Sequence, residues 1–185
     1  MSASRKDEIL EAALGSFAAT GGTAIEEVRK RSGASVGSIY HHFGGKDGIA
    51  AALYVQILRG YQEGVARALR RAAGGREGVE ALVRQHLRWV EDNPERARFL
   101  LQNAAARSGA GEELKALNRS FSTEITEWIE GQTAIRPLSL EVFYAVAIGP
   151  AQELSRLWLA GRVESLRRLE DELAAAAWRA VRLES

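Results

Sequence analysis

The sequence predicts an all-α protein. Apolar residues recur every three or four positions along nearly the whole chain, which is the spacing of one face of a helix. No stretch shows the strict apolar–polar alternation of a half-buried strand between turn signals. Glycine and proline interrupt the helical pattern at intervals. We therefore expect about nine helices, with a three-helix head joined by a long helix to a larger helical domain.

Bulk composition narrows the class further. The chain has 185 residues and no cysteine, which excludes disulfides, zinc–thiolate sites and thiol nucleophiles and suits a reducing compartment. The net charge of +1 gives no global argument for nucleic-acid binding. The longest nearly apolar run, 142–151, is far shorter than the roughly 20 residues that span a bilayer. The N-terminus lacks the apolar stretch of a secretory signal, so we expect a soluble, cytoplasmic protein that does not bind membranes.

Three short helices are expected before residue 46. Ser4 is placed to cap the first helix, which Gly21-Gly22 ends. Thr23 starts a sequence with capping-box spacing and so begins the second helix. Gly33 allows a sharp turn into the third helix, at 35–41.

A long helix follows from Lys46 to Gly74-Gly75, and five further helices fit the rest of the pattern. They are expected at 79–90, 93–104, 114–128, 138–160 and 166–180, with a break in the fourth at Gly149-Pro150. We divide the chain into a smaller domain at 1–46 and a larger domain at 47–185.

The segment 23–46 carries the functional signal. Two short helices joined by a tight glycine turn are the skeleton of a helix-turn-helix, whose second helix enters the major groove of DNA. No acid occurs from Gly33 to Gly45, and small residues at the start of the third helix would let its backbone approach base edges. The residues expected to contact DNA are Thr23, Ser35, Val36, Gly37, Ser38, Tyr40, His41, His42 and Lys46.

This segment resembles the DNA-binding domain of the TetR family. The matching residues are Gly33, Ala34, Ser35, Gly37, Ser38, Ile39, Tyr40, His42 and Phe43, between ILEAALGSF and KDGIAAAL. The loop at Gly21-Gly22 is shorter than the family usually has, and Arg29 stands where a small residue is common. The resemblance implies a homodimer built mainly by the last two helices and a ligand cavity in the larger domain. It also implies a transcriptional regulator, with release of a repressor from its operator by a small-molecule inducer as the first hypothesis.

Candidate ligand contacts are aromatic or polar residues on the apolar stripes of the larger domain. They are His86, Trp89, Phe99, Gln102, Asn103, Asn118, Phe121, Trp128 and Tyr144. Each also has a plain structural explanation, because aromatic side chains pack in cores and asparagines face solvent. His41 and His42 point about 100° apart on a helix, and no third ligand is evident, so we expect neither a metal nor a cofactor.

Apolar residues of the last two helices are the candidates for a dimer interface, namely Leu154, Leu157, Trp158, Leu166, Leu169, Leu173 and Ala177. They could equally pair within one chain and leave a monomer. The functional alternatives are an activator of the same architecture, a dimeric sensor without DNA binding, or a small helical enzyme. The sequence shows no phosphate-binding glycine loop or paired-carboxylate motif to support an enzyme.

Overall fold

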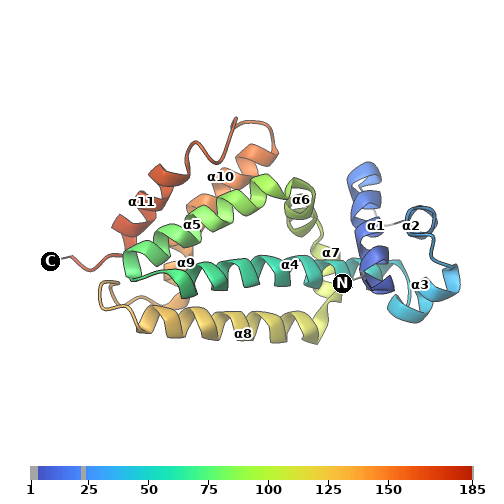
Figure 1. Cartoon of the computed structure of the whole chain (residues 1–185), viewed down its shortest axis with the longest axis horizontal. Helices are drawn as coiled ribbons and strands as arrows, with labels where there is room; N and C mark the ends of the chain where they lie inside the picture. The colour runs from blue at the N-terminus through green and yellow to red at the C-terminus, as the bar shows by residue number, and fades with distance from the viewer. Residues whose placement is uncertain (1–3, 22–23, 185) are drawn as a thin grey trace. The chain divides into compact units, whose positions relative to one another are not determined.

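The computed structural model describes residues 4–21 and 24–184 (Figure 1). Within them the chain forms eleven helices and no strand, apart from one isolated antiparallel bridge between Ile135 and Arg182. The predicted all-α class is therefore confirmed.

The helices follow one another with short connections. The first four are α1 (Arg5–Thr20), α2 (Ile25–Ser32), α3 (Val36–Phe43) and α4 (Lys46–Arg71). The next four are α5 (Gly75–Asp92), α6 (Pro94–Gln102), α7 (Ala104–Gly109) and α8 (Gly111–Glu130). The last three are α9 (Leu140–Ala147), α10 (Gly149–Leu159) and α11 (Glu170–Val181).

The chain packs into two compact units. The first unit contains the described residues up to Arg59 together with Glu95–Leu117, and the second contains Gly60–Pro94 and the described residues from Asn118 onward. The long helix α4 contributes to both units, and α6 and α7 pack with the first.

In the first unit, α1 is built as the sequence predicts. Ser4 and Asp7 form a reciprocal capping box, which satisfies backbone donors at the start of the helix. Apolar residues of one face of α1 are buried, and Phe17 meets Phe99 of α6 edge to face with ring centroids 4.9 Å apart. Arg96 of α6 also donates to Glu11 of α1 at 2.6 Å, so apolar and charged contacts both join α6 to α1.

The turn between α2 and α3 depends on Gly33. Its φ is 65°, in the left-handed region that glycine adopts without steric cost. Ala34 and Ile39 are buried behind this turn, which fixes α3 against α2 with its other face outward.

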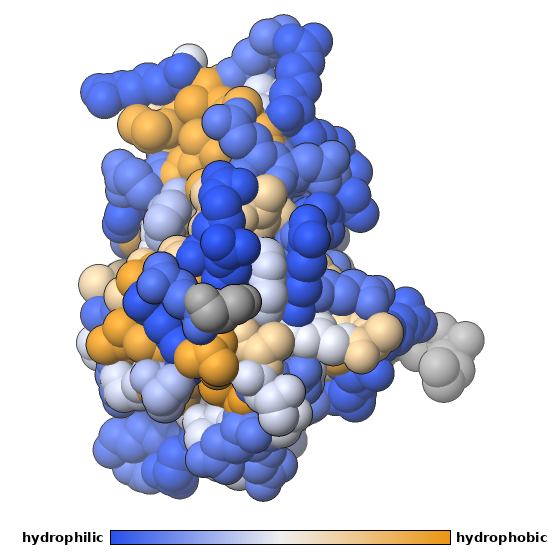
Figure 2. Space-filling model, turned by 90° about the vertical axis from the view of Figure 1, so that its left-hand side faces the viewer, coloured by the Kyte–Doolittle hydropathy of each residue, from blue (hydrophilic) through white to orange (hydrophobic). Residues whose placement is uncertain are grey.

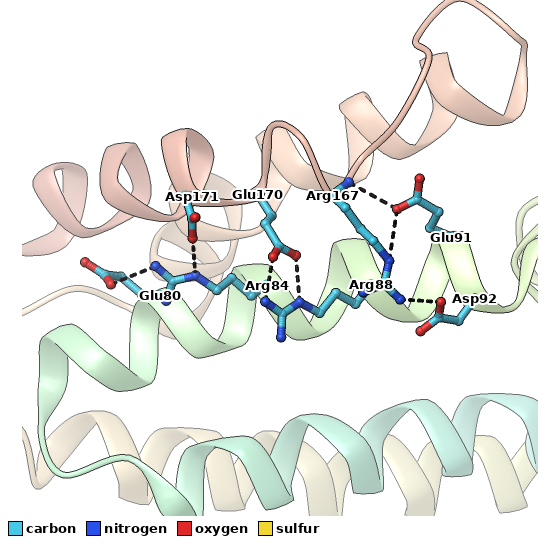
Figure 3. A network of polar contacts seen from close by, with 8 residues as sticks. All are labelled: Glu80, Arg84, Arg88, Glu91, Asp92, Arg167, Glu170 and Asp171. Carbon is cyan, nitrogen blue, oxygen red and sulfur yellow. Dashed lines mark hydrogen bonds and ion pairs between the residues drawn. The ribbon is translucent and has the colours of Figure 1, made fainter.

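In the second unit, α5 packs against α10 and α11, and α9 packs against the same two helices. Ion pairs line the contact between α5 and the segment that leads into α11 (Figure 3). Arg88 holds the buried Glu170 with two hydrogen bonds of 2.5 and 2.7 Å, and Arg84 bridges Glu80 and Asp171. A pair of hydrogen bonds at Arg136–Val181 and Leu183–Ala134 ties down the end of the chain.

One expected helix is divided in the structure and one short helix was not expected, which together account for eleven helices rather than about nine. The break at Gly149-Pro150 was expected, and Pro150 begins α10 there. The short helix α7 was not expected, because the pattern ended the preceding helix at 104 and indicated a loop at 108–111. Asn103, whose φ of −104° and ψ of 66° are not helical, separates α6 from α7. The last helix begins at Glu170 rather than near Leu166, because residues 166–169 form a turn.

Candidate nucleic-acid interface

The first two turns of α3 lie open on the surface of the first unit. Ser35, Val36 and Gly37 are exposed, Val36 by 46%, and Ser38 is half-buried. At the other end of the helix Tyr40 is 52% exposed, and His41 and His42 are exposed beside it. The helix α3 therefore presents an apolar side chain, a phenol and two imidazoles to solvent.

Ser35 combines two roles. Its side-chain oxygen accepts from the backbone N–H of Ser38 at 3.1 Å and so caps α3. The hydroxyl hydrogen of Ser35 stays available as a donor, because a hydroxyl donates once and accepts twice. The cap leaves other backbone N–H groups at the start of α3 without helical partners, a geometry that suits an anion or a base-edge acceptor.

Positive charge around α3 comes from lysines more than from arginines. Three arginines of α1 and α2 are held by acids on their own helices, in the pairs Arg5–Glu8, Arg29–Glu26 and Arg31–Glu27. Over the described part of α1–α3 and the start of α4, Lys6, Lys30 and Lys46 have no such ion pair. Arg29, one of the departures from the family pattern, is therefore occupied by Glu26, whose hydrogen bond raises the pKa of Arg29.

Thr23 was also expected to contact DNA, but it lies outside the described residues. Lys46, the last of the expected contacts, is exposed at the first position of α4.

The second unit contains a buried polar cluster around His86 of α5. The imidazole Nδ1 lies 2.8 Å from the hydroxyl of Tyr61 on α4, and Nε2 lies 3.3 Å from Ser155 Oγ on α10. Trp89 stacks edge-on against Tyr61, with ring centroids 5.0 Å apart. Burial lowers the pKa of His86 to about 4, and burial also raises the pKa of Tyr61 far above its ordinary value, with a smaller contribution from Tyr144. The cluster is therefore uncharged at neutral pH.

The other predicted ligand residues are dispersed. Phe99 is completely buried in the first unit against Phe17, and Asn103 donates to the carbonyl of Phe99 at the break after α6. Gln102 is exposed. Trp128 of α8 lies directly on Gly78 of α5, where a Cβ atom would come within 2.0 Å of the indole.

The remaining candidates lie in the second unit. Asn118 accepts from the side chain of Gln62, Phe121 is half-buried, and the half-exposed Tyr144 accepts from Gln152. None of the predicted ligand residues lines the surface hollow beside Phe43 in the first unit or the hollow beside Trp178 in the second.

The candidate dimer residues fall into two groups. Leu166 and Ala177 are buried within the chain itself. Leu154, Leu157, Trp158, Leu169 and Leu173 are half-buried and keep part of their surface open.

Sequence reasoning missed Tyr61, Gln62 and Ser155. Tyr61 lies on the apolar stripe of α4 at the spacing of core residues, and Ser155 lies beside leucines of α10. A polar group on an otherwise apolar stripe was the available signal at both positions.

The first unit contains a helix-turn-helix whose second helix is exposed, and a second helical unit accompanies it. This arrangement is typical of a class of DNA-binding regulators. Residues 9–53 match the family model described as bacterial regulatory proteins, tetR family. The HTH-type transcriptional regulator BetI 1 of Chromohalobacter salexigens is 38% identical over 90 residues, which make up 48% of this chain. The aligned part spans only 41% of that relative's length.

Solved structures share the fold over almost the whole chain. The fatty acid degradation regulator FadR from Bacillus halodurans aligns with a TM-score of 0.76 at 18% identity, covering 95% of this chain and 99% of that one. The regulator FadR from Bacillus subtilis, in complex with stearoyl-CoA, aligns with a TM-score of 0.74 at 17% identity, covering 94% and 98%. Residues 9–53 are therefore similar to the tetR family of bacterial regulatory proteins, and the whole described chain shares the fold of these solved regulators.

Neither a metal-binding cluster nor a membrane-spanning helix occurs among the described residues. No group of three or more histidine, aspartate or glutamate side chains there is placed to hold a metal ion. None of the described helices combines the length and the apolar character needed to cross a membrane.

Proposed function

We propose that this chain is a homodimeric, sequence-specific DNA-binding regulator that represses transcription until a small molecule releases it from its operator. The observation that carries the proposal is the open face of α3, where Ser35, Val36 and Tyr40 are exposed and no acid lies from Gly33 to Gly45. Residues 1–46 would bind DNA, and 47–185 would bind the ligand and form the dimer. Such a protein acts in the cytoplasm, where the operator is.

Each part of α3 has a role in this proposal. The serines and the backbone at its start approach base edges, and Val36 is suited to a thymine methyl group. Tyr40, His41 and His42 approach the phosphates, together with Lys46 and, from outside the described residues, Thr23. A dimer places two such helices in half-sites one helical turn of DNA, or a multiple of it, apart.

Release of the protein from its operator by a ligand follows from differential binding of the ligand to two arrangements of the dimer. A ligand that binds one arrangement of the dimer more tightly shifts the population towards it, and the operator is lost if that arrangement does not fit DNA. The stearoyl-CoA bound by the Bacillus subtilis FadR shows that a protein of this fold can hold a small molecule. An activator of the same architecture has the same contacts and differs only in the position of its operator.

Salt-dependent DNA binding tests the proposal. An operator is first selected from random duplexes, and its affinity is then measured by gel shift over a range of salt concentrations. Lys46→Ala should lower the slope of log K against log [salt] by about one unit per half-site, and Tyr40→Phe should weaken binding. Arg168→Ala removes an exposed positive charge in the second unit and should leave both measurements unchanged. A failure to select any duplex, or equal behaviour of all these variants, would contradict the proposal.

A further inference from the structure

In the described part of the second unit, the buried side chains include no unpaired charge. Among its described residues, the buried polar or charged side chains are Gln62, His86, Ser155 and Glu170. Glu170, the charged member of this set, is fully engaged by Arg88 at 2.5 and 2.7 Å. A buried carboxylate or phosphate of a ligand would therefore find no free cation there, and burying an unpaired charge is very costly.

The hydrogen bonds around His86 use all their donors. Ser155 donates its hydroxyl proton to the carbonyl of Ala151 at 2.8 Å, so its oxygen accepts from His86 Nε2 at 3.3 Å. With the proton on Nε2, His86 Nδ1 accepts from the hydroxyl of Tyr61 at 2.8 Å. After these hydrogen bonds are made, the Tyr61 oxygen can still accept one.

Gln62, the next residue of α4, provides a second acceptor without a donor. Gln62 is only 6% exposed, and its Nε2 donates to Asn118 Oδ1 of α8 at 3.0 Å. Its Oε1 is buried and receives no hydrogen bond from the described chain. In the first unit Gln56 Oε1 is in the same condition. A buried carbonyl oxygen without a donor is destabilising, so such atoms normally have a partner.

We propose that Gln62 Oε1 is a ligand contact, and that the second unit binds an uncharged, largely apolar molecule whose buried end carries a hydrogen-bond donor such as a hydroxyl or a primary amide. This rests on the proposed function, in which the second unit is the sensor. A carboxylate would bring an acceptor to an acceptor. An ammonium would be buried without a free anion, because Glu170 is already paired.

Four probes with the same eight-carbon tail separate these chemistries, namely 1-octanol, octanamide, octanoate and octylamine. Binding is measured at pH 7 by calorimetry and by thermal shift, on the full chain without DNA. We expect 1-octanol and octanamide to bind at least 10-fold more tightly than octanoate and octylamine. Preferred binding of octanoate or octylamine, or binding of none of the four, would overturn the proposal.

Two matched variants then locate the contact. Gln62→Leu keeps the size of the side chain but removes the unsatisfied oxygen, so it should raise the Tm of the free protein and weaken 1-octanol at least 10-fold. Gln56→Leu makes the same change at the other unsatisfied glutamine and should leave 1-octanol affinity unchanged. If Gln62→Leu binds 1-octanol like the wild type, solvent alone satisfies Oε1 and the proposal is wrong.

Operator binding of the same variants is measured separately. If only the proposed ligand class is wrong, the wild type and Gln62→Leu still bind the operator. If the proposed function is wrong, the wild type binds no operator, whichever of the four probes it binds.

Discussion

Two glycines inside α4 differ in what surrounds them. At Gly48 an added Cβ would lie 1.7 Å from the carbonyl oxygen of Phe43, because the turn from α3 brings the backbone that close. At Gly60 nothing lies within 4 Å of an added Cβ. The same substitution should therefore have opposite effects at the two positions.

Gly48→Ala should destabilise the protein by about 2 kcal/mol, because the backbone has to move to admit the methyl group. Gly60→Ala should stabilise it by up to about 1 kcal/mol, because alanine favours the helix and meets no obstacle. Urea unfolding followed by circular dichroism measures both. A stabilising Gly48→Ala would show that the close approach of α3 and α4 is absent in solution.

The buried imidazole of His86 makes stability depend on pH. Its pKa is about 4 in the folded protein, against an ordinary 6.5, and burial is the cause. As the pH falls from 6.5 towards 4, the unfolded chain takes up a proton at this position and the folded chain does not. The contribution of His86 is therefore complete above pH 6.5 and declines below it, by about 3 kcal/mol in all.

His86→Gln keeps a polar side chain at this position and removes the titration. The difference in unfolding free energy between wild type and variant should thus shrink or change sign between pH 7 and pH 4. Unfolding curves at half-unit pH steps measure it. A difference that stays constant over this range would mean that His86 does not bury its neutral form.

At the level of elements, the contact between α5 and α11 depends on a buried acid (Figure 3). Glu170 is 8% exposed, and Arg88 supplies both of its hydrogen bonds. Arg88→Ala leaves the carboxylate without its partner, and because Arg88 is itself half-exposed we expect a loss of about 2 kcal/mol rather than the full value for a buried pair.

Arg156→Ala is the matched control, because Arg156 pairs with Glu153 within one exposed helix face. Its loss should change stability by less than about 0.5 kcal/mol. Both are measured by urea unfolding at low and high salt. Equal effects of the two variants would show that Glu170 finds other donors when Arg88 is removed.

Local signals in the sequence were enough to predict most elements. The cap at Ser4, the turn at Gly33 and the break at Pro150 each follow from residues within one helical turn. The short helix α7 was not predicted in this way, because Ser108 and Gly109 are residues typical of a loop, and yet they form the end of this helix.

The polar cluster around His86 shows more clearly what the sequence pattern cannot predict. Tyr61, His86 and Ser155 come from three helices, with separations of 25 and 69 residues in the chain. Periodicity placed His86 on a buried stripe but contained no information about which helix would face it. The exposed residues of α3, in contrast, lie within one short helix, so a motif was enough to select them.

For the whole molecule, the proposed recognition of an operator depends on dimer formation. The second unit exposes Val142 by 45% and Tyr144 by 44% on α9, and Figure 2 shows apolar side chains among charged ones on the face that carries the C-terminus. Half-buried leucines of α10 and α11 are the further candidates. A dimer of this 20.2 kDa chain should sediment at about twice that mass.

Val142→Asp should shift the protein towards the monomer, because a carboxylate replaces an apolar side chain that the second copy covers in the proposed dimer. Operator affinity should fall with it, since one α3 reads a single half-site. Analytical ultracentrifugation measures the first effect and gel shift the second. A duplex carrying one half-site should bind wild type and Val142→Asp equally, because that contact needs only one head.

Leu101→Asp provides the control, since Leu101 is 52% exposed on α6 of the first unit. The same loss of exposed apolar surface there should leave both the mass and the operator affinity unchanged. If Val142→Asp behaved like Leu101→Asp, α9 would lie outside the dimer interface, and α10 and α11 would have to form it without α9. If the wild type itself sedimented as a monomer, the two-half-site operator would lose its physical basis.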